Sequence, residues 1–287
     1  RPAGVRGGGG LFYGVAMTRL EATLLFRFVA GLVAGGLGYG IRRFFPGIEK
    51  ADAAPWAATL SYVSTAFGVV VGFSILFLFG QFAAARSAVG DEATSIGTAF
   101  EEAKLFPAAS EGIQGALICY GRSVSEFDWP SMRNDGVGAS QVDQTFSDLV
   151  ASLGQGDTAT TGALNSAAAT NMASQVGSIS TARETRLVAA ETSVPTMLWL
   201  LLFVGAAFVV ALIFMVTHSA APLTQSLLLG ASAIFTAVLI LLVVSLSRPY
   251  SGGGGSVTPR LIEQTTTFME SSAPQVAAQP CPDAAKD

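Results

Sequence analysis

The chain has 287 residues, of which 51% are hydrophobic and only 13% are charged, whereas soluble domains carry roughly 25% charged residues. Residues 53–85 and residues 192–247 contain no Asp, Glu, Lys or Arg. Such long uncharged stretches are typical of membrane-spanning helices, which need about 20 apolar residues each. The composition excludes an ordinary soluble globule and predicts an all-α polytopic protein of the lipid bilayer. The net charge of −4, without a basic stripe, argues against nucleic acid as a partner.

The N-terminal part is expected to contain a flexible segment, residues 1–19, followed by two spans within residues 20–85. The first expected span, residues 22–41, contains a single charge, Arg27, and glycines one turn apart at Gly31 and Gly35. Such small residues let two helices approach closely. Arg27 has two interpretations: a buried charge that faces a polar partner, or a side chain that reaches the lipid headgroups from the start of the helix.

The second expected span, residues 56–82, is rich in phenylalanine and has Gly68 and Gly72 one turn apart. These glycines are candidates for close helix packing. Phe73 and Phe77 lie one turn apart on one face and are candidates for the lining of a narrow apolar pore that gates by excluding water. The alternative is that both phenylalanines pack against lipid or neighbouring helices.

Between spans two and three lies an extramembrane domain, residues 86–195, with 6 basic and 13 acidic side chains. Its apolar residues recur at spacings of 3 and 4, which predicts helices. The first helix continues from span two as far as Pro107, and the next begins near Ser110. Further helices are expected at residues 141–153 and from residue 158 towards span three. The domain is therefore predicted to be a helical bundle continuous with spans two and three.

Residues 196–248 are predicted to hold two spans, residues 196–215 and residues 223–246, joined by a polar turn at His218. After them, residues 249–287 are rich in Gly, Pro, Ser and Ala. We expect this tail to be mostly flexible.

The charged residues of the domain offer one candidate ion-pairing site. Arg183 and Arg186 lie one turn apart, before span three. They are expected to pair with Asp91 or Glu92 on the helix that follows span two. Binding to lipid phosphates and lining of a vestibule remain as alternatives.

Glu126 and Asp128 end a predicted helix beside Trp129 and Pro130. Two neighbouring carboxylates can serve acid/base chemistry or a cation. A structural role is favoured, in which Trp129 packs into the bundle and Pro130 stops the helix.

The sequence predicts no catalytic, metal or cofactor site. His218 is the only histidine, and Cys119 and Cys281 are 162 residues apart, so neither a nucleophile with its base nor a metal-ligand spacing is apparent. Both cysteines are expected to be reduced and unpaired. The chain is therefore not expected to be an enzyme.

The sequence resembles the bacterial bestrophin-like domain family of unknown function, whose members have four spans. The resemblance covers residues 28–259, and Ser247 departs from the Asp or similar polar residue expected there. The residues that carry the resemblance are 69–79, Ala85, Val89, Glu92, Ala93, Tyr120, Glu126, Trp129, Pro130, Arg183, Arg186, Leu187, Pro195, Trp199, Pro249, Tyr250 and Gly252.

The resemblance implies a likeness to bestrophins, which are pentameric anion channels with a cytosolic helical domain. Two functions follow as hypotheses: a homo-oligomeric ion channel whose pore is lined by span two, and a non-conducting structural or accessory subunit of a larger membrane complex. The domain's excess of acidic residues would repel anions, which counts against anion selectivity.

Four spans place both termini on one side of the membrane, which we expect to be the cytoplasmic side of the bacterial inner membrane. Basic residues favour the cytoplasmic side. Those that support this orientation are Arg1, Arg6, Arg19, Arg86, Arg183, Arg186, Arg248 and Arg260, and those against it are Arg42, Arg43 and Lys50.

Overall fold

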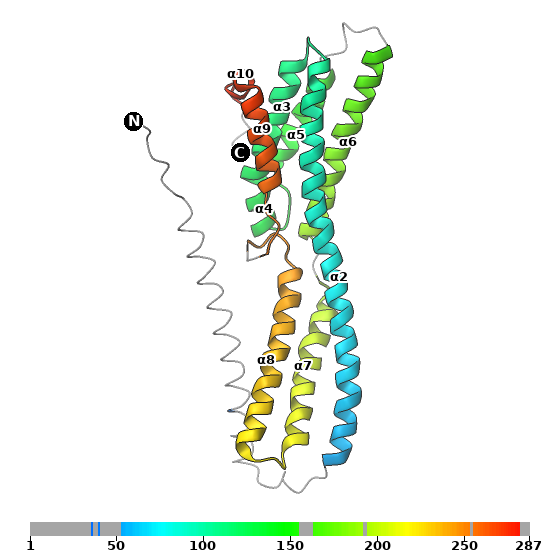
Figure 1. Ribbon diagram of the computed structural model, residues 1–287, viewed down its shortest axis with the longest axis vertical. Coiled ribbons are helices and arrows are strands. Elements are labelled where there is room, and N and C mark those ends of the chain that lie inside the picture. Colours follow the sequence, from blue (N-terminus) through cyan, green and yellow to red (C-terminus); the bar gives the residue numbers. More distant parts are fainter. Residues whose placement is uncertain are drawn as a thin grey trace, which may run out of the picture. The chain divides into compact units, whose positions relative to one another are not determined.

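The computed structural model describes residues 36, 40, 53–154, 163–191, 194–252 and 255–281 (Figure 1). Within these ranges every regular element is a helix, which confirms the predicted all-α class. The described residues divide into two compact units. Unit 1 contains those up to Phe79 and those from residue 194 to Ser247, and unit 2 contains the remainder.

Unit 1 contains the apolar helices. Its elements are the first part of α2 (Ala53–Glu102), α7 (Thr196–Thr217) and α8 (Pro222–Leu246). These three helices are long and apolar enough to cross a membrane. The first expected span lies outside the described residues except for Gly36 and Gly40, so the candidates Arg27, Gly31 and Gly35 lie outside them as well. The same holds for the expected flexible segment 1–19.

The small core of unit 1 joins the three helices. Val71 and Leu78 of α2 pack with Leu202 of α7 and Val243 of α8. At Gly205 a Cβ atom would lie 2.6 Å from the ring of Phe67, so a side chain here would displace that ring, and the glycine lets α7 lie close to α2. The turn between α7 and α8 is closed by His218, whose Nδ1 lies 2.6 Å from the carbonyl oxygen of Met215. His218 thus has a local structural contact.

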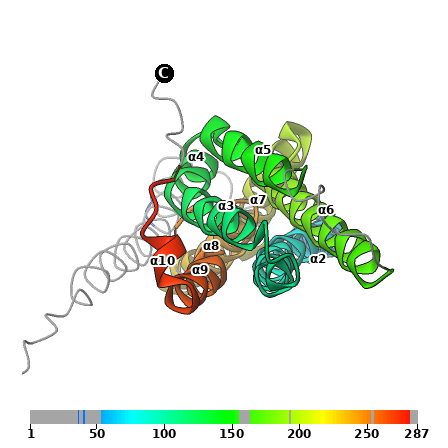
Figure 2. The same cartoon turned by 90° about the horizontal axis from the view of Figure 1, so that it is seen from above.

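Unit 2 is a helical bundle. α3 (Ser110–Ser123) packs against both α5 (Ser140–Gly154) and α9 (Arg260–Ser272), as Figure 2 shows. The other elements are the second part of α2, the 3₁₀ turn η2 (Ala103–Leu105), the π-helical segment η3 (Val124–Asp128), α4 (Trp129–Asn134), α6 (Ala163–Glu191) and α10 (Pro274–Ala277). The core contains Phe100, Leu117, Tyr120, Leu149 and Ile179.

The predicted continuity of the domain with the spans is confirmed at one end only. α2 has no break between Gln81 and Val89. At the other end α6 stops at Glu191, and α7 begins at Thr196 after Pro195, whose φ of −52° and ψ of 136° are not helical. Proline lacks an N–H and clashes with the preceding turn, so a helix cannot run straight through this position.

The prediction that Pro130 stops a helix is wrong. α3, η3 and α4 follow one another directly from Ser110 to Asn134, and Pro130 lies in the first turn of α4. The wider π turn of η3 precedes the proline, and the amide that proline lacks is not required in a first turn. The chain therefore changes helix type at this point without ending.

The prediction of a mostly flexible tail is also wrong for residues 260–277. They form α9 and α10, and Ile262, Thr266 and Met269 of α9 are buried at spacings of 4 and 3 residues. This periodicity is that of a helix with one core-facing side. The glycines and prolines on either side dominate the composition of the tail and obscure this short pattern.

The expectation of unpaired cysteines is wrong as well, because Cys119 of α3 and Cys281 form a disulfide with their Cα atoms 5.5 Å apart. The packing of α9 and α10 on α3 closes the 162-residue separation in sequence. Sequence separation alone could not show this proximity.

Candidate functional site

A buried ion pair joins α2 to α6 within unit 2. Glu92 and Arg186 are both fully buried. The Arg186 guanidinium donates from Nε to Glu92 Oε2 (2.9 Å) and from Nη2 to Glu92 Oε1 (3.2 Å). Two parallel hydrogen bonds of this kind fix the orientation of both groups and are among the stronger contacts that proteins make.

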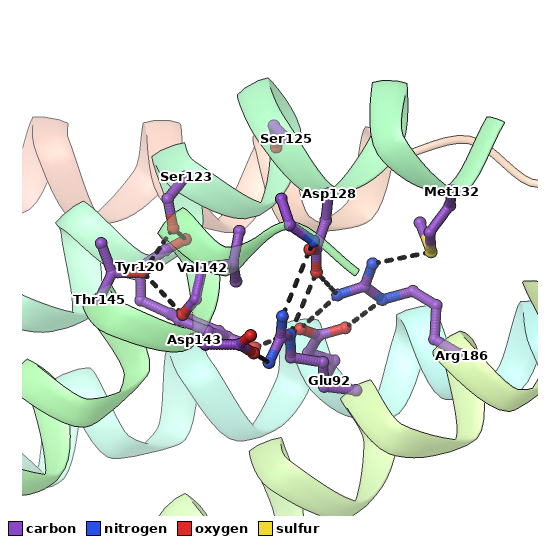
Figure 3. A network of polar contacts seen from close by, with 12 residues as sticks. Glu92, Tyr120, Ser123, Ser125, Asp128, Met132, Val142, Asp143, Thr145 and Arg186 are labelled. Carbon is purple, nitrogen blue, oxygen red and sulfur yellow. Dashed lines mark hydrogen bonds and ion pairs between the residues drawn. The ribbon is translucent and has the colours of Figure 1, made fainter. Parts of the chain in front are cut away.

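Asp128, at the end of η3, connects this pair to a second arginine. Its Oδ2 accepts a hydrogen bond from Arg186 Nη2 (2.9 Å), as Figure 3 shows. The same oxygen accepts a hydrogen bond from Arg183 Nε (3.1 Å). Asp128 Oδ1 accepts the backbone N–H of Ala139 (2.8 Å). Arg183 also donates from Nη1 to Asp143 of α5 (2.6 Å). The network thus connects α2, η3, α5 and α6.

Two aromatic residues, Tyr120 and Trp129, contact the network, and a third, Tyr250, packs against Trp129. The hydroxyl of Tyr120 donates to Glu92 Oε1 (2.7 Å). The Arg186 guanidinium lies 4.8 Å from the ring centre of Trp129, within the range of a cation–π contact. Tyr250 packs edge-on against Trp129, with the ring centres 5.9 Å apart. The described residues provide no hydrogen-bond partner for the buried hydroxyl of Tyr250.

The two neighbouring carboxylates of η3 lie in different environments. Asp128 is buried, four residues after the buried Val124, whereas Glu126 is exposed. Residues two apart point to different sides of a helix. Asp128 therefore joins the network and Glu126 does not.

The charges in this network compensate one another. Burial alone lowers the pKa of Arg186, but the carboxylates of Glu92 and Asp128 outweigh it and raise the pKa. Burial likewise lowers the pKa of Arg183, while its hydrogen bond to Asp128 contributes most to the net rise. Both arginines therefore remain charged and paired. The two buried carboxylates, Glu92 and Asp128, balance the two guanidinium groups, and the exposed Asp143 adds a third carboxylate at the edge of the network. A buried centre with balanced charge suits the joining of helices.

Tyr120 gives the network a dependence on pH. Burial, together with the negative charge of Glu92, raises the pKa of Tyr120 well above its usual value. The unfolded chain therefore loses this proton first, at about pH 10. Tyr120 contributes stability that is complete below about pH 10 and is lost as the pH rises towards the folded-state pKa.

We expect the stability difference between the wild type and Tyr120→Phe to shrink by about 1.4 kcal/mol between pH 9 and pH 11, because only the wild type carries this ionisation. Urea unfolding at several pH values measures the difference. Tyr250, whose pKa burial also raises, is present in both proteins and cancels. A pH-independent difference would contradict the prediction.

The structure places the other predicted site residues as follows. Asp91 is exposed and accepts a hydrogen bond from Ser87 (3.2 Å), so it points away from the network that contains Glu92. Phe73 and Phe77 are 69% and 62% exposed on α2. A Cβ atom at Gly68 or Gly72 would meet no described atom within 4 Å.

Three residues of the network are not assigned to it by the sequence analysis: Asp128, which is given a structural role, Tyr120, which is named only among the residues that carry the family resemblance, and Asp143. The nearest available signal was Asp128 directly before Trp129 and Pro130. Within the described ranges no group of three His, Cys, Asp or Glu side chains is arranged for a metal ion.

The fold defines the class: an integral membrane protein with apolar helices and a helical domain held together by a buried ion-pair network. Residues 28–259 match the family described as Bestrophin-like domain. The chain belongs to the bestrophin-like family, as the resemblance implied. A comparison with curated proteins finds no match.

Solved structures support the same fold. A variant of a bacterial bestrophin homologue from Klebsiella pneumoniae has a TM-score of 0.68 at 13% identity, with 89% of this chain and 99% of that chain covered. Another structure of a bestrophin homologue from this organism, solved by Zn-SAD phasing, has a TM-score of 0.66 at 13% identity, with 90% and 100% covered. At this identity the similarity shows the fold alone.

Proposed function

We propose that the protein forms a homo-oligomeric ion channel in which α2 of each subunit lines the pore. The family relationship supports a bestrophin-like assembly. The observation that carries the proposal is the exposed apolar face of α2, where Phe73 and Phe77 are more than half exposed among the described residues. In an assembly around an axis, this face supplies a ring of large apolar side chains, which can gate by excluding water.

The glycines of α2 support association of subunits. Gly68 and Gly72 have open space where a side chain would be. A helix surface with small residues one turn apart allows another helix to come close. A second copy of the chain is the proposed occupant of this surface.

The charge of unit 2 bears on ion selectivity. Residues 86–195 contain 13 acidic and 6 basic side chains. Glu92 and Asp128 are buried against Arg186 and Arg183, so these four charges largely cancel. The remaining excess of acidic residues would attract cations to a vestibule and repel anions. Selectivity therefore has to be measured separately from conduction.

The second candidate is a non-conducting structural or accessory subunit. The observation in its favour is that Ser74, His218 and Gln225, the buried polar residues described in unit 1, each contact a backbone carbonyl nearby. They form no continuous polar path through the described spans of one subunit. This candidate shares the membrane location and the association with other subunits.

Ion flux from liposomes containing the purified protein distinguishes the two candidates. We expect flux under a chloride or a potassium gradient, and a mass in detergent that corresponds to several copies of the chain. Liposomes without protein provide the baseline. An intact oligomer without flux of either ion would support the accessory role, and a monomer in mild detergent would contradict the proposed assembly.

The proposed orientation places unit 2 and both termini in the cytoplasm of a bacterial cell. Arg1, Arg6, Arg19, Arg248 and Arg260 support it, because basic residues in short segments next to the spans favour the cytoplasmic side. The unpaired cysteines that were expected to support it are in fact paired. A membrane-impermeant thiol reagent applied to spheroplasts should label Ser219→Cys and leave Ser271→Cys unlabelled, in a background without the native cysteines. The reverse pattern would contradict this orientation.

A further inference from the structure

The C-terminal end of the described chain is attached to α3 through one side of that helix. Cys119 forms the disulfide with Cys281, which follows α10. One turn earlier, a Cβ atom at Gly115 would lie 3.4 Å from Val276 of α10. Almost one turn later, Arg122 donates from Nη2 to the carbonyl oxygen of Ala277 (3.0 Å). Three successive turns of α3 thus contact the segment from Val276 to Cys281.

The noncovalent part of this attachment rests on a few small side chains. Val276 is the buried residue of the four-residue α10, and Ala273 and Ala277 pack partly buried against the core. The other polar contact is between Arg122 and Glu270 of α9 (2.7 Å), in which both side chains are more than a third exposed. Exposed ion pairs contribute little to stability. The disulfide is therefore the strongest link between α10 and α3.

The two ends of the bond differ in their surroundings. A cavity of about 370 Å³ between α3, α5 and α10 is lined by Cys119, Arg122, Val276 and Pro280, whereas Cys281 is not part of its lining. Cys119 is buried, whereas Cys281 is only partly buried. The Sγ atom of Cys281 lies 3.9 Å from Nη1 of Arg122. A small thiol can reach Cys281 more readily than Cys119, and the arginine places a positive charge where a thiolate would approach.

We propose that Cys119–Cys281 is a reversible thiol switch that attaches α10 to α3 when oxidised and releases it when reduced. A dithiol reductant supplies the electrons: its thiolate attacks Cys281 Sγ, the bond to Cys119 breaks, and Cys119 leaves as a thiolate that takes up a proton. The second thiol of the reductant then displaces Cys281, which also ends as a thiol. The reductant becomes a cyclic disulfide, so two electrons and two protons are transferred.

The proposal is independent of the channel function. It follows from the cysteine pair and the weakness of the remaining contacts. In the orientation proposed above, unit 2 faces a reducing compartment, where disulfides are usually transient or redox-sensing.

Hydrogen–deuterium exchange of the full-length protein in detergent, in buffers of reduced and oxidised dithiothreitol, tests the switch. The amides of Ala277, Ala278 and Gln279 close α10 by hydrogen bonds to residues 273–276. We expect the exchange of these amides to become about tenfold faster or more on reduction. Without the disulfide, α10 can unfold locally while α3 stays folded. Exchange in α5 should stay unchanged, and reoxidation should restore slow exchange. Alkylation and mass measurement count the free thiols.

Cys281→Ser provides the matched variant, because it removes the more exposed of the two sulfur atoms and leaves the buried Cys119 in place. Its α10 amides should exchange rapidly in both buffers. Unchanged exchange after complete reduction would overturn the proposal, as would a disulfide that becomes reducible only when the whole protein unfolds. Either result would identify a static covalent link.

Discussion

Replacement of Arg186 by methionine is expected to destabilise unit 2 by about 3–5 kcal/mol. The substitution removes a fully buried cation that forms salt bridges with both Glu92 (2.9 Å) and Asp128 (2.9 Å). Removal of one partner leaves buried carboxylates without compensation, and that cost is larger than the net contribution of the intact pair. Unfolding of the detergent-solubilised protein in urea, followed by tryptophan fluorescence, measures the loss.

Lys104→Met provides the matched control, since it removes a cation from an exposed pair. Lys104 and Glu101 lie 2.6 Å apart, but their side chains are 51% and 49% exposed. The expected change is within about 0–1 kcal/mol, because water and salt screen such a pair.

A second substitution tests the cause of the effect. Adding Glu92→Gln to Arg186→Met removes one of the unpaired charges, so the double variant should lose less stability than the sum of the two single variants. Additive losses would contradict a coupling between Arg186 and Glu92, and a loss for Arg186→Met no larger than for Lys104→Met would show that the network contributes little to stability. Double-mutant analysis is appropriate here because the residues are in direct contact.

The helices were predictable where local signals agree with the final packing. Ser110 begins α3, and Thr196 begins α7, both as the sequence predicts. Pro107 lies three residues before Ser110, and Pro195 lies directly before Thr196. Each proline limits the preceding helix, and an apolar periodicity follows it. The predicted fourth span, residues 223–246, agrees with α8 to within one residue.

The errors arise where the outcome depends on distant parts of the chain. α9 is stabilised because Ile262 and Met269 reach the core built by α2, α3 and their neighbours. The disulfide requires the same packing. Composition within a window of the tail contains none of this information, because the partner surface lies about 150 residues away in the sequence.

The candidate site was predictable only in part, for a similar reason. Helical spacing aligns Arg183 with Arg186, and the first turns after span two supply Glu92. Asp128 lies four residues after the buried Val124, but this spacing does not indicate which arginines its carboxylate will bind. The sequence therefore predicted the pair of Arg186 with Glu92. For Arg183 the predicted partner is wrong, because this arginine pairs with Asp128 and Asp143.

The apolar face of α2 leads to the second large expected effect. We expect Phe73→Ala or Phe77→Ala to raise ion flux from liposomes about tenfold or more, which corresponds to about 1.4 kcal/mol removed from the barrier. Both side chains are largely exposed and lie one turn apart, so in the proposed assembly they form two adjacent rings. Removing a ring of aromatic groups widens the dry segment and lets water enter.

The measurement uses chloride and potassium gradients separately, with the oligomer checked by mass in detergent. Phe235→Ala is the matched control: Phe235 is 65% exposed on α8, so the same apolar area is removed from a helix that does not line the proposed pore. Its flux should equal that of the wild type. A rise common to all three variants would indicate general leakage of the bilayer. Unchanged flux in Phe73→Ala and Phe77→Ala, with wild-type conduction present, would contradict a constriction formed by α2, because the narrowest segment would then lie elsewhere.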